Sequence, residues 1–179
     1  MMQGPATERA FAFVERADYL IGRTLDVVVI AMAGLLLILL NYAVFARFIL
    51  NDSVSWGEEL PANMLAILTF IGAAYLTRTN EHLGFDAVVR ELPARMKTIV
   101  MCGNLILMAG FGALLAYYGS IAAMSFGARQ LISIDLPMAL FRAAMPLGGA
   151  LITLFCLIRL ASLVTGRISA DDLLPESDA

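Results

Sequence analysis

The sequence predicts an all-α integral membrane protein with four transmembrane helices, short interfacial amphipathic helices and both termini in the cytoplasm. Three observations carry this prediction: the composition, the spacing of charged residues and the distribution of arginine and lysine. Of the 179 residues, 60% are hydrophobic and 15% are charged, and the mean hydropathy is +0.82. A soluble domain usually has about 25% charged residues, so the composition indicates a membrane protein with little soluble mass.

Four long stretches contain no charged residue, and each predicts a membrane helix. They are residues 27–46, 60–77, 98–128 and 143–158. A spanning helix needs about 20 mostly apolar residues, and the shortest stretch reaches this length if the flanking Arg142 and Arg159 extend to opposite interfaces. We therefore predict one membrane domain over residues 1–168, followed by a short, acidic, disordered tail over 169–179. The helices are expected at about 24–50, 56–77, 94–127 and 138–165.

The positive residues predict the orientation, because lysine and arginine mark the cytoplasmic side. Nine precede the first helix, separate the second from the third, or follow the fourth: Arg9, Arg16, Arg23, Arg78, Arg90, Arg95, Lys97, Arg159 and Arg167. The other two connections carry three: Arg47, Arg129 and Arg142. Both termini are therefore expected in the cytoplasm.

Two segments beside the spans have the pattern of interfacial helices. Apolar residues between Ala10 and Leu25 recur at helical spacing, which predicts either a helix lying in the cytoplasmic interface or an extension of the first membrane helix. Residues 85–92 have one apolar side and predict a short interfacial helix. Pro93 then suits the first turn of the third membrane helix.

The third helix carries a stripe of small residues that predicts close packing on another helix of this chain or of a partner. The stripe consists of Gly112, Ala116, Gly119, Ser120, Ala123 and Gly127. In the fourth helix, Pro146 with Gly148 and Gly149 is expected to kink or loosen the helix.

Several catalytic and cofactor chemistries lack the residues that they need. Cys102 and Cys156 lie inside predicted helices and have no C-x-x-C spacing, which favours inert thiols. His82 is the only histidine, so one chain cannot supply two histidines to a haem, and a zinc site is not supported. We expect no cofactor, no metal and no enzymatic activity. A net charge of −3 without a basic cluster gives no support for nucleic-acid binding.

The polar residues at membrane depth also argue against an independent carrier. Ionisable residues in a membrane usually mark an ion or substrate path, and none lies near a predicted helix centre. The main internal polar residues are expected to form hydrogen bonds between helices. They are Asn41, Asn63, Thr69 and Asn104. The chain is therefore expected to hold a complex in the membrane rather than to perform chemistry.

The stretch NDSVSWGEEL, residues 51–60, places two glutamates and the only tryptophan before the second helix. Ser55-x-x-Glu58 has the spacing of a capping box, whereas a helix start nearer Leu60 fits Pro61 better. Glu59 is expected either to pair with Arg47 or to remain a solvated acid. Trp56 is predicted to be an interfacial anchor first and a partner contact second.

Four segments of the chain together resemble a known family. SWGEEL begins at residue 55, FIGAAYLTR at 70, GFDAVVRELPARMK at 84 and LPMALFRAAMPLGG at 136. This order resembles the small membrane subunit, DctQ-like, of tripartite ATP-independent periplasmic (TRAP) transporters, over about residues 47–159.

The resemblance implies a role in sodium-coupled uptake of organic acids across the bacterial inner membrane. In that family a periplasmic binding protein captures an organic anion and contacts the membrane subunits transiently. A large multi-helix subunit carries the substrate by an elevator motion, and the small subunit supports it among the membrane lipids. Arg78, His82 and Asp86, at the cytoplasmic end of the second helix, are then either ordinary interface charges or contacts to the large subunit. The alternative is a four-helix anchor or assembly subunit of an unrelated membrane complex.

Overall fold

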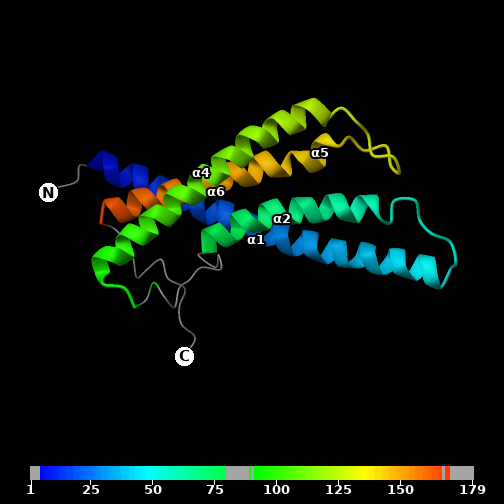
Figure 1. Cartoon of the computed structure of the whole chain (residues 1–179), viewed down its shortest axis with the longest axis horizontal. Helices are drawn as coiled ribbons and strands as arrows, with labels where there is room; N and C mark the ends of the chain where they lie inside the picture. Colours follow the sequence, from blue (N-terminus) through cyan, green and yellow to red (C-terminus); the bar gives the residue numbers. More distant parts are fainter. Residues whose placement is uncertain (1–4, 80–88, 90, 167, 170–179) are drawn as a thin grey trace.

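The computed structural model describes residues 5–79, 89, 91–166 and 168–169, with side chains from residue 21 onward except at residue 94. Its helices are α1 (Pro5–Phe48), α2 (Glu59–Thr79), α4 (Ala94–Phe126), α5 (Ala139–Arg142) and α6 (Ala144–Val164) (Figure 1). Four stretches are long and apolar enough to span a membrane: Ile21–Phe48, Glu59–Thr79, Arg95–Phe126 and Ala139–Val164. The predicted all-α fold with four spans is confirmed.

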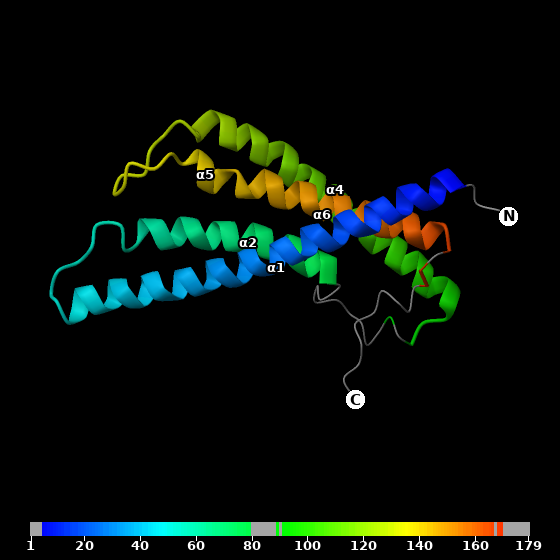
Figure 2. The same ribbon diagram turned by 180° about the vertical axis from the view of Figure 1, so that it is seen from behind.

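The helices pack in the order α1, α2, α6 and α4, so that α6 lies between α2 and α4 (Figures 1 and 2). Two connections lie at one end of the bundle: residues 49–58, between α1 and α2, and residues 127–138, which we call the α4–α5 loop. We call this end the loop end. The last turn of α2, the first turn of α4 and the last turn of α6 lie at the opposite end.

Glycines allow α6 to approach both of its neighbours. A Cβ atom on Gly149 would lie 2.6 Å from the Gly112 carbonyl oxygen and 2.6 Å from the Ala116 nitrogen, both backbone atoms of α4. A Cβ atom on Gly148 would lie 2.6 Å from the Phe70 carbonyl oxygen of α2. In lipid, where apolar burial does not drive association, such close backbone contact holds helices together. These two glycines therefore let the backbone of α6 contact the backbones of both α2 and α4.

The buried side chains form two clusters along the bundle. The first joins α2, α4 and α6 and contains Ala74, Leu105, Ala109, Ile152, Cys156 and Leu163. The second lies toward the loop end and contains Leu36, Met64, Leu131 and Phe141. The α4–α5 loop thus contributes a core residue, Leu131, whose side chain is only 3% exposed.

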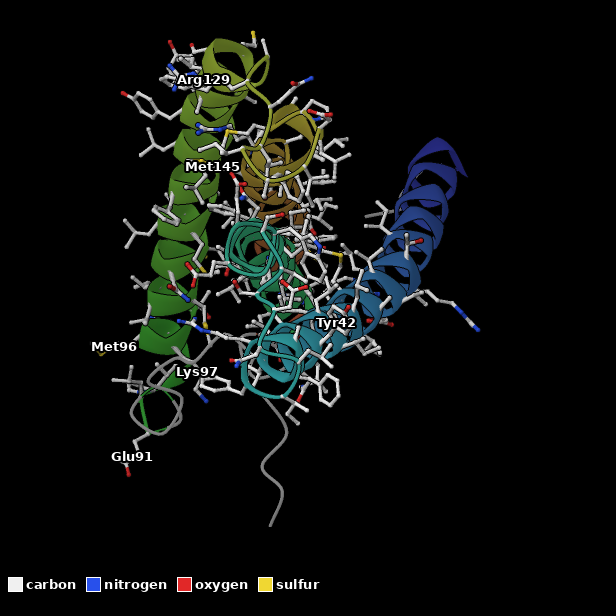
Figure 3. The ribbon with its side chains drawn as sticks, turned by 90° about the vertical axis from the view of Figure 1, so that its right-hand side faces the viewer. Tyr42, Glu91, Met96, Lys97, Arg129 and Met145 are labelled. Carbon is white, nitrogen blue, oxygen red and sulfur yellow. The ribbon has the colours of Figure 1, made fainter. Side chains whose placement is uncertain are left out.

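Helix α1 is continuous from Pro5 to Phe48. The N-terminal flank therefore extends the first membrane helix, which is one of the two predicted alternatives. Helix α1 packs on α2 and is inclined away from α4 and α6 (Figure 3). Its large apolar side chains, such as Ile30 and Ile38, remain exposed and face lipid or a partner.

The predicted fourth helix corresponds to α5 and α6, which are separated only by Ala143, a residue with helical φ and ψ of −63° and −22°. Pro146 has no N–H to donate to the carbonyl of Arg142, four residues earlier, and its ring crowds that carbonyl. The local effect of Pro146 is therefore one missing backbone hydrogen bond, while the helical path continues through Ala143, whose carbonyl accepts the Leu147 amide at 3.1 Å. The predicted interfacial helix over 85–92 and most of the acidic tail fall outside the described residues.

Candidate functional site

The turn between α1 and α2 ends one helix with an asparagine and starts the next near a proline. The Leu50 amide donates to the Phe45 carbonyl, and Asn51 follows with a φ of 56°. Asparagine tolerates this left-handed conformation better than most residues. Helix α2 begins at Glu59, so Pro61 lies in its first turn, where a missing N–H costs little.

This helix start differs from the capping box predicted at Ser55 and Glu58. Ser55 and Glu58 both lie in a turn that precedes the helix. The first carbonyl acceptors are those of Trp56 and Glu58, which receive the amides of Leu60 and Ala62. The later start, which fits Pro61, is the alternative that the structure adopts.

The two adjacent glutamates have different partners, and this corrects the predicted pairing. Arg47 pairs with Glu58, at 3.5 Å, and not with Glu59. Both side chains are exposed, 64% for Arg47 and 92% for Glu58. Exposed pairs of this kind contribute little because both charges remain solvated and mobile.

Glu59 instead holds the α4–α5 loop against α2. Its Oε1 accepts the Ile132 amide at 3.1 Å, and its Oε2 accepts both the Ser133 amide at 2.9 Å and the Ser133 hydroxyl at 2.5 Å. The partners lie more than seventy residues away in sequence. Three hydrogen bonds to one carboxylate fix the loop over the start of α2, where Leu131 enters the core.

Trp56 packs against α1 near the same end. Its ring stacks on Tyr42, with the centroids 5.9 Å apart and the planes 8° from parallel. Stacked aromatic pairs add about 0.5–1.5 kcal/mol beyond the area that they bury. Trp56 therefore joins the turn to α1, a contact that its predicted role as an interfacial anchor did not include.

The opposite end of the bundle uses two arginines to join three helices. The Arg159 guanidinium of α6 donates to the carbonyls of Thr77 and Arg78, which lie in the last turn of α2. These carbonyls have no partner within their own helix, and the helix dipole favours a cation there. The Arg78 guanidinium lies on α1 at Gly22, where a side chain would collide with it.

These contacts bear on the residues predicted at this end. The side chain of Arg78, a residue of α2, contacts α1 at Gly22, so Arg78 has a packing role within the chain. His82 and Asp86 fall outside the described residues. Sequence reasoning missed Arg159 and Gly22 as contact residues. The available signal was the placement of Arg159 at the end of an uncharged run.

The small-residue stripe of α4 faces α6 of the same chain. A Cβ atom on Gly112 would lie 2.7 Å from the Thr153 hydroxyl, and one on Gly119 would lie 2.8 Å from the Pro146 nitrogen. Ala116 meets Gly149, as described above. The Ser120 hydroxyl donates to carbonyls of its own helix, and Ala123 accepts the Gly127 amide.

The internal polar residues differ from the expected bonds between helices. Asn41 donates to Leu37, Asn63 to Glu59 and Thr69 to Leu65, each bond reaching the carbonyl four residues earlier at 2.7–2.8 Å. Asn104 lies on an exposed face of α4. Within the described residues no three acidic, histidine or cysteine side chains gather as a metal site. The arrangement is suited to fastening helices and loops together.

Comparison with known proteins agrees with this arrangement. Residues 36–166 match the sequence profile of the family described as "Tripartite ATP-independent periplasmic transporters, DctQ component". The sialic acid TRAP transporter small permease protein SiaQ of Vibrio cholerae is 21% identical over 125 residues, which cover 69% of this chain and 72% of that protein.

A second relative is the C4-dicarboxylate TRAP transporter small permease protein DctQ of the same species. It is 31% identical over 62 residues, which cover 34% of this chain and 27% of that protein. The family profile spans most of the chain, from the last part of α1 through the α1–α2 turn, α2, α4, the α4–α5 loop, α5 and α6. The chain therefore belongs to the DctQ-component family of TRAP transporters and is a multi-pass small permease subunit.

Proposed function

We propose that this chain is a non-catalytic scaffold that supports the large, substrate-carrying subunit of a sodium-coupled TRAP transporter for organic acids. A periplasmic binding protein delivers the substrate and contacts the membrane complex transiently. The complex lies in the bacterial inner membrane, with both termini of this chain in the cytoplasm and the loop end facing the periplasm. The distribution of positive residues supports this orientation.

One observation carries the scaffold role: three polar side chains within the described spans are already bonded to their own helices. Asn41, Asn63 and Thr69 each donate to a carbonyl one turn earlier. The charged residues of the described spans lie near the ends of those spans. An anion and its sodium ions need polar groups at membrane depth, so the path is expected in the large subunit.

The substrate class rests on the relatives and on the chemistry that they share. The names of the two relatives refer to sialic acid and to C4-dicarboxylates, and both of these substrates are carboxylates. We therefore propose that the transporter to which this chain belongs also carries an organic acid. The other two components are then expected to choose among individual acids.

Co-purification tests the proposed partnership. The tagged chain, expressed together with the large membrane subunit of the same transporter and extracted in mild detergent, is expected to retain that subunit through gel filtration. An unrelated four-helix membrane protein with the same tag serves as the control. Elution of this chain by itself, folded and without the large subunit, would contradict the proposal.

A further inference from the structure

Two arginines at the loop end share one aromatic ring. The Cζ atom of Arg129 lies 5.4 Å from the centroid of the Phe126 ring, and that of Arg142 lies 5.1 Å from it. Both distances fall within the range of a cation–π contact. Phe126 is the last residue of α4 and Arg142 is the last of α5. Both positive charges therefore lie over one ring, where two membrane-spanning segments end.

Backbone hydrogen bonds fix the positions from which these side chains extend. The Arg129 amide donates to Phe126, and the Arg129 carbonyl accepts the Met138 amide at 2.8 Å. The Arg142 amide donates to the Met138 carbonyl at 3.0 Å. Met138 is thus bonded to both arginines, and the pair is held together by the fold of the α4–α5 loop.

Within the described residues, neither guanidinium forms an ion pair with an acid. Each guanidinium has five N–H donors, and the side-chain bond recorded for Arg142 is a contact of 3.9 Å with the Met138 sulfur. Arg47, at the same end, differs in this respect: it lies 6.0 Å from the Phe48 ring but pairs with Glu58. Two positive charges held on one ring attract an anion more strongly than either charge does by itself.

The depth of the pair indicates which anion is available. The spanning segment of α4 ends at Phe126, and the next segment begins at Ala139, three residues before Arg142. Arginine side chains at span ends extend to the headgroup region. Phosphate oxygens there match the planar donor fork of a guanidinium, and such charge-assisted bonds are strong.

We propose that Arg129 and Arg142, seated on Phe126, bind the phosphate of a phospholipid headgroup at the loop end. Arg129 extends from the tip of the bundle next to α4 (Figure 3). The site anchors the α4–α5 loop to the membrane surface, in addition to its bonds to Glu59. It depends on the membrane-spanning fold and not on the proposed transport role.

Native mass spectrometry of the purified full chain, incubated with phosphatidylglycerol, tests this site. The R129Q/R142Q double variant is expected to retain about one phospholipid fewer per chain than the parent, because the phosphate loses both charge-assisted donors. The single variant Arg129→Gln, altered only in the exposed loop, is expected to show part of this loss. Arg47→Gln is the matched control and is expected to retain the parental number.

Three results would overturn the proposal. The first is equal lipid retention by the parent and by both Arg129 variants, with helix content by circular dichroism unchanged. The second is release of the bound phospholipid by soluble glycerol 3-phosphate, which would indicate a site for a free oxyanion. The third is unchanged lipid retention with loss of the co-purifying large subunit in the double variant, which would assign the arginines to a protein carboxylate.

Discussion

Gly149→Leu is expected to separate α4 from α6 and to destabilise the chain by at least about 3 kcal/mol, the upper end of the usual cost of overpacking. The new side chain would meet the Gly112 carbonyl and the Ala116 nitrogen, at 2.6 Å from its Cβ. These are backbone atoms of a helix, which cannot rotate aside as a side chain can. The measurement is thermal unfolding of the purified chain in detergent, followed by circular dichroism and gel filtration.

Gly110→Leu is the matched control for this prediction. Gly110 lies in α4 two residues from Gly112, and a Cβ atom there would have no neighbour within 4 Å. This variant is expected to unfold at the parental temperature. Equal stability of the Gly149 and Gly110 variants would show that α4 and α6 do not approach as closely as described.

Glu59→Ala is expected to release the α4–α5 loop from α2. The amides of Ile132 and Ser133 would lose their common acceptor, and the Ser133 hydroxyl would lose a bond of 2.5 Å. Both amides should therefore exchange their hydrogens for deuterium faster. Leu131, next to them, should become more accessible because the loop no longer presses it into the core.

Glu58→Ala provides the comparison, since Glu58 is the adjacent carboxylate and, among the described residues, its ion pair is with the exposed Arg47. In the Glu58→Ala variant, the amides of the α4–α5 loop should exchange hydrogen for deuterium at the parental rates. The Met138 amide, bonded to Arg129 within the loop, reports whether the loop itself stays folded. If Ile132 and Ser133 exchange equally in all three proteins, Glu59 does not hold the loop.

The helical membrane fold could be predicted because lipid imposes strong constraints on sequence. A spanning segment must be long, apolar and helical, so the uncharged runs alone locate the four helices. Local sequence signals mark both ends of α4. Pro93 precedes the first residue of α4, and Gly127 follows its last.

The contacts at the loop end could not be read in the same way. Adjacent residues of a helix point about 100° apart. If the start of α2 is uncertain by one residue, the sequence does not show which of Glu58 and Glu59 points toward a given neighbour. The true partners of Glu59, Ile132 and Ser133, lie in a loop whose path depends on how α4 and α6 pack. Only the folded chain brings them together.

The polar residues within the spans show a third limit. Asn41 and Thr69 were expected to bond across helices, but each has a carbonyl of its own helix one turn earlier. This local bond is always within reach of a serine, threonine or asparagine in a helix. Sequence alone cannot choose between the local acceptor and one on a neighbouring helix.

Reconstitution into liposomes tests the central claim most directly. Proteoliposomes are prepared with this chain alone, with the large subunit alone, and with both, each with the binding protein, a radiolabelled organic acid and an inward sodium gradient. We predict uptake only when all three proteins are present, because the proposed function assigns the substrate path to the large subunit and the support of that subunit to this chain. Uptake by this chain without the large subunit would contradict the account.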